Sequence, residues 1–489
     1  MSIDKNQVSK RDIVLGLSWT TLSTVVNGLS QILRLSILTR FLSKEEFGII
    51  AILTLVLGFT QVFSDVGLSA AIMSEKILDR KRFLSLYWLQ FIIFNTLVVV
   101  VSCLSPLIAN YYKVESLMWL LPIMLLELSF VSVGKLYDTV LQKELHFKSI
   151  CIRNIIANII SLLIAVILAS IGAGVYSLII STLSQAAIVN FWNLLVGQKE
   201  YKIKFAKIHF KEISSLLKVG GFQMGTQIVD YIASKLDIII ISSFLGVAPL
   251  GLYSLAKELI IKLVTILNTI VARVMLPVLA KYNDNIVLLR KTFIGFISRL
   301  ALFNIPITGG VFLFASPIVH IFYGSNYTEA IDIVRIMSIW GLFVIMCSPN
   351  GLLSLVRKHT DSLFFYTIIR VIIMGMMLSI FAKQSLIAAA ITMVVVYLIM
   401  LFVSWYLQVY KEIKLSLWDY LKNYLYIGLV VIFATFILYY ISKFLVEESI
   451  ISYVLLLILY VSTVLAYLCL FEKKTKKLFT TGINKIIRK

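Results

Sequence analysis

Two short stretches at corresponding places in the chain decide the fold: FLSKEEFG at Phe41–Gly48 and FLGVAPLG at Phe244–Gly251. Their phenylalanine, leucine and final glycine match at a constant offset of 203 residues. Each stretch follows one long apolar segment and opens the next, and the offset spans six such segments. Unless two short apolar strings match by chance, the sequence predicts two pseudo-symmetric six-helix lobes.

Composition indicates the solvent in which these segments fold. Hydrophobic residues make up 60% of the 489 residues and charged residues 14%, against about 25% charged in an ordinary soluble domain. The mean hydropathy is +0.95. These values exclude a cytosolic enzyme, a secreted disulfide scaffold and a disordered chain. They predict an all-α integral membrane protein.

Fourteen apolar segments are long enough to cross a bilayer. They run over residues 13–41, 47–72, 84–109, 117–138, 151–171, 173–197, 217–245, 249–275, 292–320, 329–350, 361–382, 385–409, 423–446 and 450–471. The connecting loops leave no room for a soluble domain. The expected domains are an N-lobe over residues 1–205, a C-lobe over 206–412, two additional helices over 413–472 and a basic cytoplasmic tail over 473–489.

Basic residues predict the orientation. Thirty-one of the 45 Lys and Arg lie in one set of alternate loops and the two tails, whereas five lie in the other set. Because Lys and Arg concentrate in cytoplasmic loops, both termini are expected in the cytoplasm. The net charge of +20 then reflects topology, and we expect no nucleic-acid partner.

Nine basic and seven acidic residues fall inside the predicted segments. Each costs about 2.5–3.5 kcal/mol at a helix centre on insertion scales, so several must line a wet interior or pair with one another. Polar residues in the first segment share one helix face at Thr20, Thr24, Asn27, Gln31 and Arg34. The seventh segment repeats this spacing at Gln223, Gln227, Asp230, Ser234 and Asp237.

These faces supply the candidate site residues. The cations expected to bind an anionic substrate are Arg34, Lys235, Lys262, Arg299 and Arg370. The polar residues expected in the same lumen are Asn27, Gln31, Gln227 and Ser234. A proton or Na⁺ could be coupled to transport through Asp65, Asp230 or Asp237.

The alternative interpretation is structural, with the same polar groups holding helices together. Glu258–Lys262 and Asp332–Arg335 are spaced for pairing along one helix. Arg273 could reach the cytoplasmic surface. Lys235 could pair with Asp237 through a local distortion of the helix.

The sequence shows no motif for metal binding, nucleotide binding or catalysis. The four Cys lie far apart in apolar segments and the four His have no ligand spacing, which argues against a metal site. Gly246 and Gly251 give the nearest approach to a nucleotide-binding loop, but Leu252 follows where that loop needs Lys. We therefore expect neither a cofactor nor catalytic activity.

Five stretches in order resemble the polysaccharide flippases of bacteria, the Wzx-type exporters of O-antigen, capsule and teichuronic acid. They are LTRFLSKEEFGIIAI (38–52), FSDVGLSAAI (63–72), KLDIIIISSFLGVAPLGLYSLAKEL (235–259), VMLPVLAKYND (274–284) and YGSNYTEAIDIVRIMSIWG (323–341). The resemblance covers residues 10–410 and places the chain in the superfamily of the MATE drug antiporters and the lipid II flippase. Fourteen helices, rather than twelve, resemble the lipid II branch.

The resemblance implies transport of an undecaprenyl-diphosphate-linked oligosaccharide across the bacterial cytoplasmic membrane for surface polysaccharide assembly. It also implies alternating access of two six-helix lobes, with lumen cations holding the diphosphate or acidic sugars. The expected partners are this substrate, membrane lipids and other polysaccharide-assembly membrane proteins. One rival hypothesis is a MATE-like cation-coupled drug antiporter, for which the lumen should be more acidic. The other is a non-transporting enzyme or scaffold of the cell envelope.

Overall fold

The computed structural model describes residues 10–65, 72–73, 79–198, 202–203, 208–444 and 450–471. Every regular element in these ranges is a helix. The helices form two compact units, which are treated separately below. The first contains the chain up to Lys262 together with Thr367–Thr392, and the second contains Leu263–Tyr366 and the chain from Met393 onward. This division follows packing, so the lobes drawn from chain order remain a prediction.

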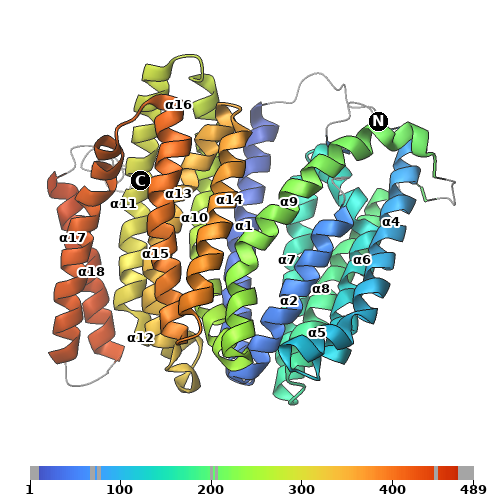
Figure 1. The fold of residues 1–489 in the computed structure, drawn as a ribbon, viewed down its shortest axis with the longest axis horizontal. Coiled ribbons are helices and arrows are strands. Elements are labelled where there is room, and N and C mark those ends of the chain that lie inside the picture. Colours follow the sequence, from blue (N-terminus) through green and yellow to red (C-terminus); the bar gives the residue numbers. More distant parts are fainter. Residues whose placement is uncertain are drawn as a thin grey trace, which may run out of the picture. The chain divides into compact units, whose positions relative to one another are not determined.

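The first unit contains the helices of the N-terminal half of the chain (Figure 1). They are α1 (Lys10–Leu38), α2 (Lys44–Asp65), α4 (Arg80–Cys103), α5 (Ser105–Tyr112), α6 (Leu117–Lys143), α7 (Phe147–Ser170), α8 (Val175–Gly197) and α9 (Phe210–Leu245). Helix α6 packs against α4 and α8, α1 packs against α7, and α2 packs against α9. Three further helices contribute to both units, namely α10 (Val247–Lys281), α14 (Thr360–Phe381) and α15 (Leu386–Ser404).

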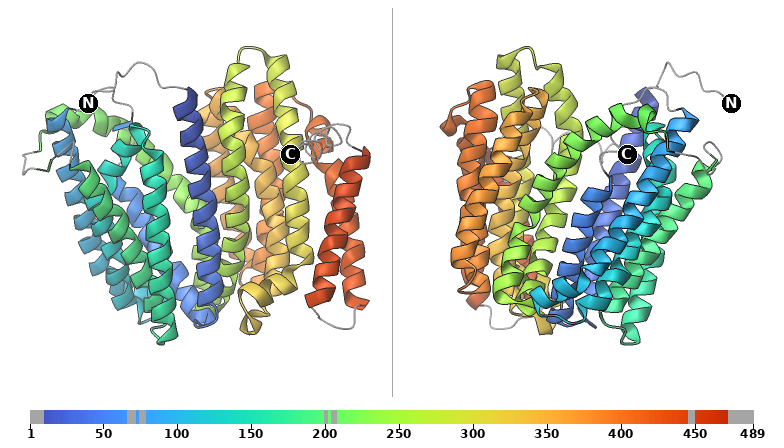
Figure 2. Two further views of the ribbon diagram at one scale, coloured as in Figure 1. Left: turned by 180° about the vertical axis from the view of Figure 1, so that it is seen from behind. Right: turned by 45° about the vertical axis from the view of Figure 1, so that its right-hand side comes forward.

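The second unit surrounds an apolar core that includes Phe293, Met346 and Tyr420. Its elements are α11 (Ile286–Leu313), α12 (Ala315–Phe322), the 3₁₀ turn η1 (Ser325–Tyr327), α13 (Ala330–Val356), the π-helical turn η2 (Trp405–Tyr410), α16 (Lys411–Ile413), α17 (Leu417–Phe444) and α18 (Ile450–Phe471). Helix α11 packs against α13 and α17. Helices α17 and α18, red in Figure 2, lie side by side.

Each of the fourteen predicted apolar segments overlaps a helix within the residues that the structure describes. Within the described residues, eight helices are long and apolar enough to cross a membrane. A ninth span is added if α11 and α12, which meet at a 75° bend, count as one. The all-α membrane fold is thereby confirmed, whereas the number of fourteen spans remains a prediction.

The two matching stretches start α2 and α10 in different ways. Before α2, the Ser43 N–H donates to Glu46 Oε2 at 2.7 Å, and the Glu46 N–H donates to Ser43 Oγ at 3.3 Å. This reciprocal capping box satisfies two backbone donors at the helix start. Before α10, Gly246 adopts φ +83°, a conformation that favours glycine.

The final glycines of the two stretches form a reciprocal contact inside the first unit. A Cβ at Gly48 would overlap the carbonyl group of Val247, and a Cβ at Gly251 would overlap the carbonyl oxygen of Lys44. Both contacts join positions that correspond at the offset of 203, since Lys44 corresponds to Val247 and Gly48 to Gly251. The final glycine of each stretch thus touches the same position of the other stretch. A pseudo-twofold axis produces reciprocal contacts of this kind. The geometry therefore supports the internal repeat.

Candidate substrate-binding site

Charged side chains from α1, α6, α9 and α10 influence one another within the first unit. Arg34, near the end of α1, is half-buried. The carboxylates of Glu127 on α6 and Glu258 on α10 attract its guanidinium group. Arg34 forms no salt bridge with any residue that the structure describes. The N–H donors of its planar guanidinium group are therefore not bound to a described carboxylate.

A buried ion pair joins α9 to α10. Lys257 Nζ lies 2.5 Å from Asp237 Oδ2, and the two side chains are 7% and 0% exposed. The hydroxyl of Tyr253 donates to the same carboxylate oxygen at 2.5 Å. Asp237 thus pairs with a lysine of the next helix, and the alternative pair with Lys235 on its own helix is not formed.

The same region has more cations than carboxylates. Lys262 pairs with Glu258 along α10, with Nζ 3.4 Å from Oε2, as the sequence predicted. Lys235 is half-buried on α9 and lies within electrostatic reach of Lys257, Glu258 and Lys262, but it forms no salt bridge with a described residue. The cluster, called here the charged cluster, consists of Arg34, Glu127, Lys235, Asp237, Lys257, Glu258 and Lys262. Its formal charge is positive, which suits an anionic ligand.

Helices α9 and α14 meet at a second polar contact in the first unit. The hydroxyl of Thr367 donates to Asp230 Oδ1 at 3.2 Å. Asp230 is exposed. Arg370 is half-buried three residues after Thr367, which places the two on one face of α14. Asp230 and Arg370 are therefore candidates on two helices that contact each other.

Two of the four predicted lumen residues on α1 and α9 have hydrogen-bond partners in the structure. Asn158 on α7 donates to Asn27 and accepts from Gln185 on α8 at 2.8 Å, so Asn27 contributes to helix packing. The Ser234 hydroxyl donates to the carbonyl oxygen of Tyr231 at 2.8 Å. Gln31 and Gln227 are half-buried. A lumen-lining role for these four residues stays a prediction.

The remaining candidates lie elsewhere. Arg299 belongs to the second unit, where it is exposed on α11 and has no salt-bridge partner in the described ranges. In the same unit, Arg335 Nη1 lies 2.9 Å from Asp332 Oδ1, so this predicted pair is confirmed. Asp65 ends α2, and its side chain lies outside the described residues, as do those of Gln223 and Arg273.

Three members of this region were not among the predicted site residues: Glu127, Tyr253 and Lys257. Lys257 and Glu127 are visible in the sequence as charges within apolar segments. Tyr253 precedes Lys257 by four residues and so shares its helix face. Such spacing groups residues on one helix, but it does not reveal that their partner is Asp237 on the preceding helix.

Solved structures show which class of protein has this fold. The lipid II flippase MurJ in an inward closed conformation is 18% identical, with a TM-score of 0.75, and the match covers 94% of this chain and 99% of that one. A multidrug resistance transporter of the MATE family in an inward-facing conformation is 13% identical, with a TM-score of 0.62 over 82% of this chain and 94% of that one. The fold is that of multi-pass membrane transporters of the MOP superfamily.

The sequence relatives then identify the family. A model of the family described as "Polysaccharide biosynthesis protein" matches residues 37–332, and the chain belongs to this family. The teichuronic acid biosynthesis protein TuaB of Bacillus subtilis is 27% identical over 73% of this chain and 74% of its own length. The lipopolysaccharide biosynthesis protein WzxC of Escherichia coli is 23% identical over 73% of this chain and 72% of its own length. The chain thus belongs to a polysaccharide biosynthesis family and shares its fold with membrane transport proteins.

Proposed function

We propose that this protein moves a lipid-linked oligosaccharide, built on undecaprenyl diphosphate, from the inner to the outer leaflet of the bacterial cytoplasmic membrane. The observation that carries the proposal is the positive charged cluster, in which Arg34 and Lys235 have no described salt-bridge partner. Relatives named for teichuronic acid and lipopolysaccharide biosynthesis support this substrate class. The glycan would serve surface polysaccharide assembly.

The proposed mechanism is alternating access of the two predicted lobes. An arginine binds phosphate with two parallel hydrogen bonds, and a lysine adds a point charge. Arg34 and Lys235 would hold the diphosphate. Lys262 would leave its salt bridge with Glu258 and pair with the substrate instead. Arg299 and Arg370 complete the proposed set of cations, and Asn27, Gln31, Gln227 and Ser234 would contact the sugars.

Orientation and partners form part of the same proposal. One set of alternate loops and the two tails carry 31 Lys and Arg, whereas the other set of loops carries five. This difference supports cytoplasmic N- and C-termini. Besides its substrate and the surrounding lipids, the protein would contact other membrane proteins of polysaccharide assembly.

Coupling to a proton or Na⁺ is proposed through Asp230. This carboxylate is exposed and accepts one hydrogen bond from Thr367, which leaves further lone pairs for a cation. Asp237 is held by Lys257 and Tyr253, so it is less available for this role. Asp65 stays a third candidate.

Deletion of the gene tests the proposed function directly. The expected result is loss of the surface glycan together with accumulation of its lipid-linked precursor on the cytoplasmic side, because synthesis continues when translocation stops. Unchanged glycan would overturn the proposal. Increased drug susceptibility with normal glycan would instead support the MATE-like antiporter.

Replacing Arg34 or Arg370 by alanine is expected to reduce transport at least tenfold, or about 1.4 kcal/mol, because each change removes a phosphate-binding cation. Complementation of the deletion strain measures the effect, and immunoblots of membrane fractions show whether the protein is retained. Arg34→Lys should recover part of the activity, since it keeps the charge but loses bidentate geometry.

The matched control is Arg335→Ala, which removes an arginine paired with Asp332 in the second unit. This variant should transport normally. Full complementation by both Arg34→Ala and Arg370→Ala would show that these cations serve packing only.

A further inference from the structure

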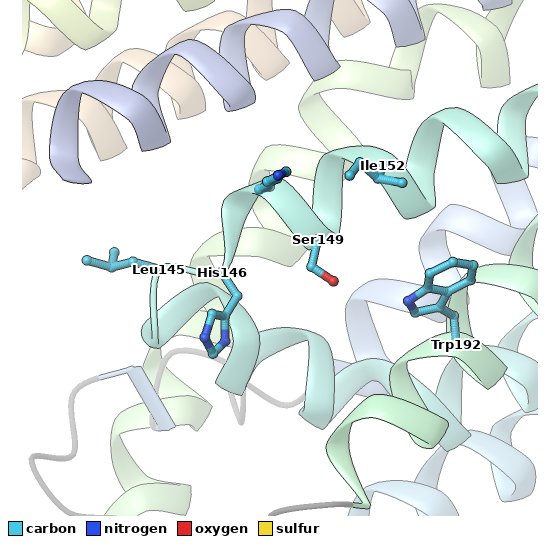
Figure 3. A pocket seen from close by; sticks show the side chains of 6 residues that line it. Leu145, His146, Ser149, Ile152 and Trp192 are labelled. Atoms are coloured by element: carbon cyan, nitrogen blue, oxygen red, sulfur yellow. The ribbon is translucent and has the colours of Figure 1, made fainter. Parts of the chain in front are cut away.

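A hollow of about 450 Å³ lies at the start of α7, outside the charged cluster (Figure 3). It is lined by Leu145, His146, Lys148, Ser149, Ile152 and Trp192. The first five come from the turn before α7 and its first two turns, and Trp192 comes from α8. The lining therefore combines polar groups on one segment with an aromatic wall from the neighbouring helix.

The polar groups of this hollow suit a phosphate ester. The Lys148 side chain is exposed, and its ammonium nitrogen lies 5.9 Å from the centre of the Trp19 ring on α1. Ser149 adds a hydroxyl donor and His146 an imidazole, whose Nδ1 lies 3.6 Å from the Glu144 carboxylate. An ammonium group beside neutral donors attracts an oxyanion more strongly than a zwitterion.

Apolar residues continue from the hollow along α7. Ile152 at its edge is 38% exposed, and Ile159, Leu163 and Ile167 follow at helical spacing with 53%, 56% and 59% of their surface exposed. Helix α7 is one of those long and apolar enough to cross a membrane. We expect an exposed apolar stripe on such a helix to face acyl chains. The hollow and the stripe together fit a ligand with a polar head and a hydrocarbon tail.

The predicted orientation of the chain assigns the hollow to the inner leaflet. Residues 139–153 carry Lys143, Lys148 and Arg153 and belong to the loops assigned to the cytoplasm. Trp19 and Trp192 flank the site, and tryptophan is enriched at the depth of lipid headgroups. Basic pockets between helices on the cytoplasmic side are a recurrent type of site for anionic headgroups.

We propose that this hollow binds the headgroup of an anionic phospholipid of the inner leaflet, of the phosphatidylglycerol type. Lys148 would contact the phosphate, Ser149 and His146 would donate to headgroup oxygens, and the acyl chains would follow the stripe on α7. The proposal does not depend on which molecule the protein transports.

Lipid binding to the purified full-length protein tests this site. Native mass spectrometry would measure the binding of phosphatidylglycerol, phosphatidylcholine and undecaprenyl phosphate separately. Wild type should prefer phosphatidylglycerol over phosphatidylcholine. Lys148→Glu should weaken phosphatidylglycerol binding about tenfold or more, because it reverses a charge near the phosphate. Trp192→Ala should weaken binding without changing charge.

The matched control is Lys291→Glu, which reverses an exposed lysine on α11 that does not line the hollow. It should bind phosphatidylglycerol as wild type does. Equal loss in the Lys148 and Lys291 variants would attribute binding to net charge alone and overturn the proposal. A preference for undecaprenyl phosphate over phosphatidylglycerol would overturn it as well, by showing a site for the carrier lipid instead.

Discussion

Replacing Lys257 by methionine is expected to lower the free energy of unfolding by about 3–5 kcal/mol. The methionine keeps most of the volume of the side chain but leaves the carboxylate of Asp237, which is 0% exposed, without its cation. Tyr253 would still donate to Asp237, but one hydroxyl does not replace a charge partner. Reversible unfolding of the purified protein in mixed micelles measures the change.

Lys262→Met provides the matched control on the same helix. Its pair with Glu258 is partly exposed, at 26% and 40%, and such a pair contributes only about 0.3–0.5 kcal/mol along a helix. The double variant Asp237→Asn, Lys257→Met should regain part of the stability, because it no longer buries an unpaired charge. If the destabilisation of the double variant equalled the sum of those of Asp237→Asn and Lys257→Met alone, direct coupling between Lys257 and Asp237 would be refuted.

Replacing Gly48 by valine should destabilise the first unit by at least about 3 kcal/mol, at the upper end of the usual cost of overpacking. The reason is that the new side chain would meet the backbone of Val247 at the start of α10, and backbone atoms cannot rotate away. Gly251→Val should have a similar effect, because it strikes Lys44 in the reciprocal position. Accumulation in membranes and unfolding in mixed micelles report the loss.

Gly225→Val is the comparison for this experiment. Gly225 lies on α9 in the same unit, and a Cβ there would have no neighbour within 4 Å. Valine at this position should change stability little, since glycine is the poorer helix former of the two. Combining Gly48→Val with Gly251→Val should cost less than the sum of the single changes, because both disrupt one helix crossing. Wild-type stability of Gly48→Val would refute the close contact.

Periodicity and composition predicted the features that depend on neighbours along one helix. Every predicted apolar segment overlaps a helix in the described part of the chain. The pairs Glu258–Lys262 and Asp332–Arg335 form as their spacing indicated. These predictions succeed because hydrocarbon imposes internal backbone hydrogen bonding on each segment. Helix geometry then fixes which residues within a segment are adjacent.

Partners on different helices could not be predicted in this way. The sequence offered Lys235 as a candidate partner of Asp237. In the structure, Asp237 on α9 pairs with Lys257 on α10 instead. The sequence also gave no sign that Asn27 on α1 bonds Asn158 on α7. Each such choice depends on how two helices cross, and crossing geometry follows from the packing of many side chains at once.

The amino-acid order alone determined that this chain is a helical membrane protein, and it predicted an internal repeat and charges within the apolar segments, because hydropathy and spacing are local properties. Only the tertiary structure decided which of those charges neutralise one another. It joined Lys257 to Asp237 and left Arg34 and Lys235 without a described carboxylate partner. The physical reason is that an ion pair forms over a few ångströms in space, and distance along the chain does not determine that separation.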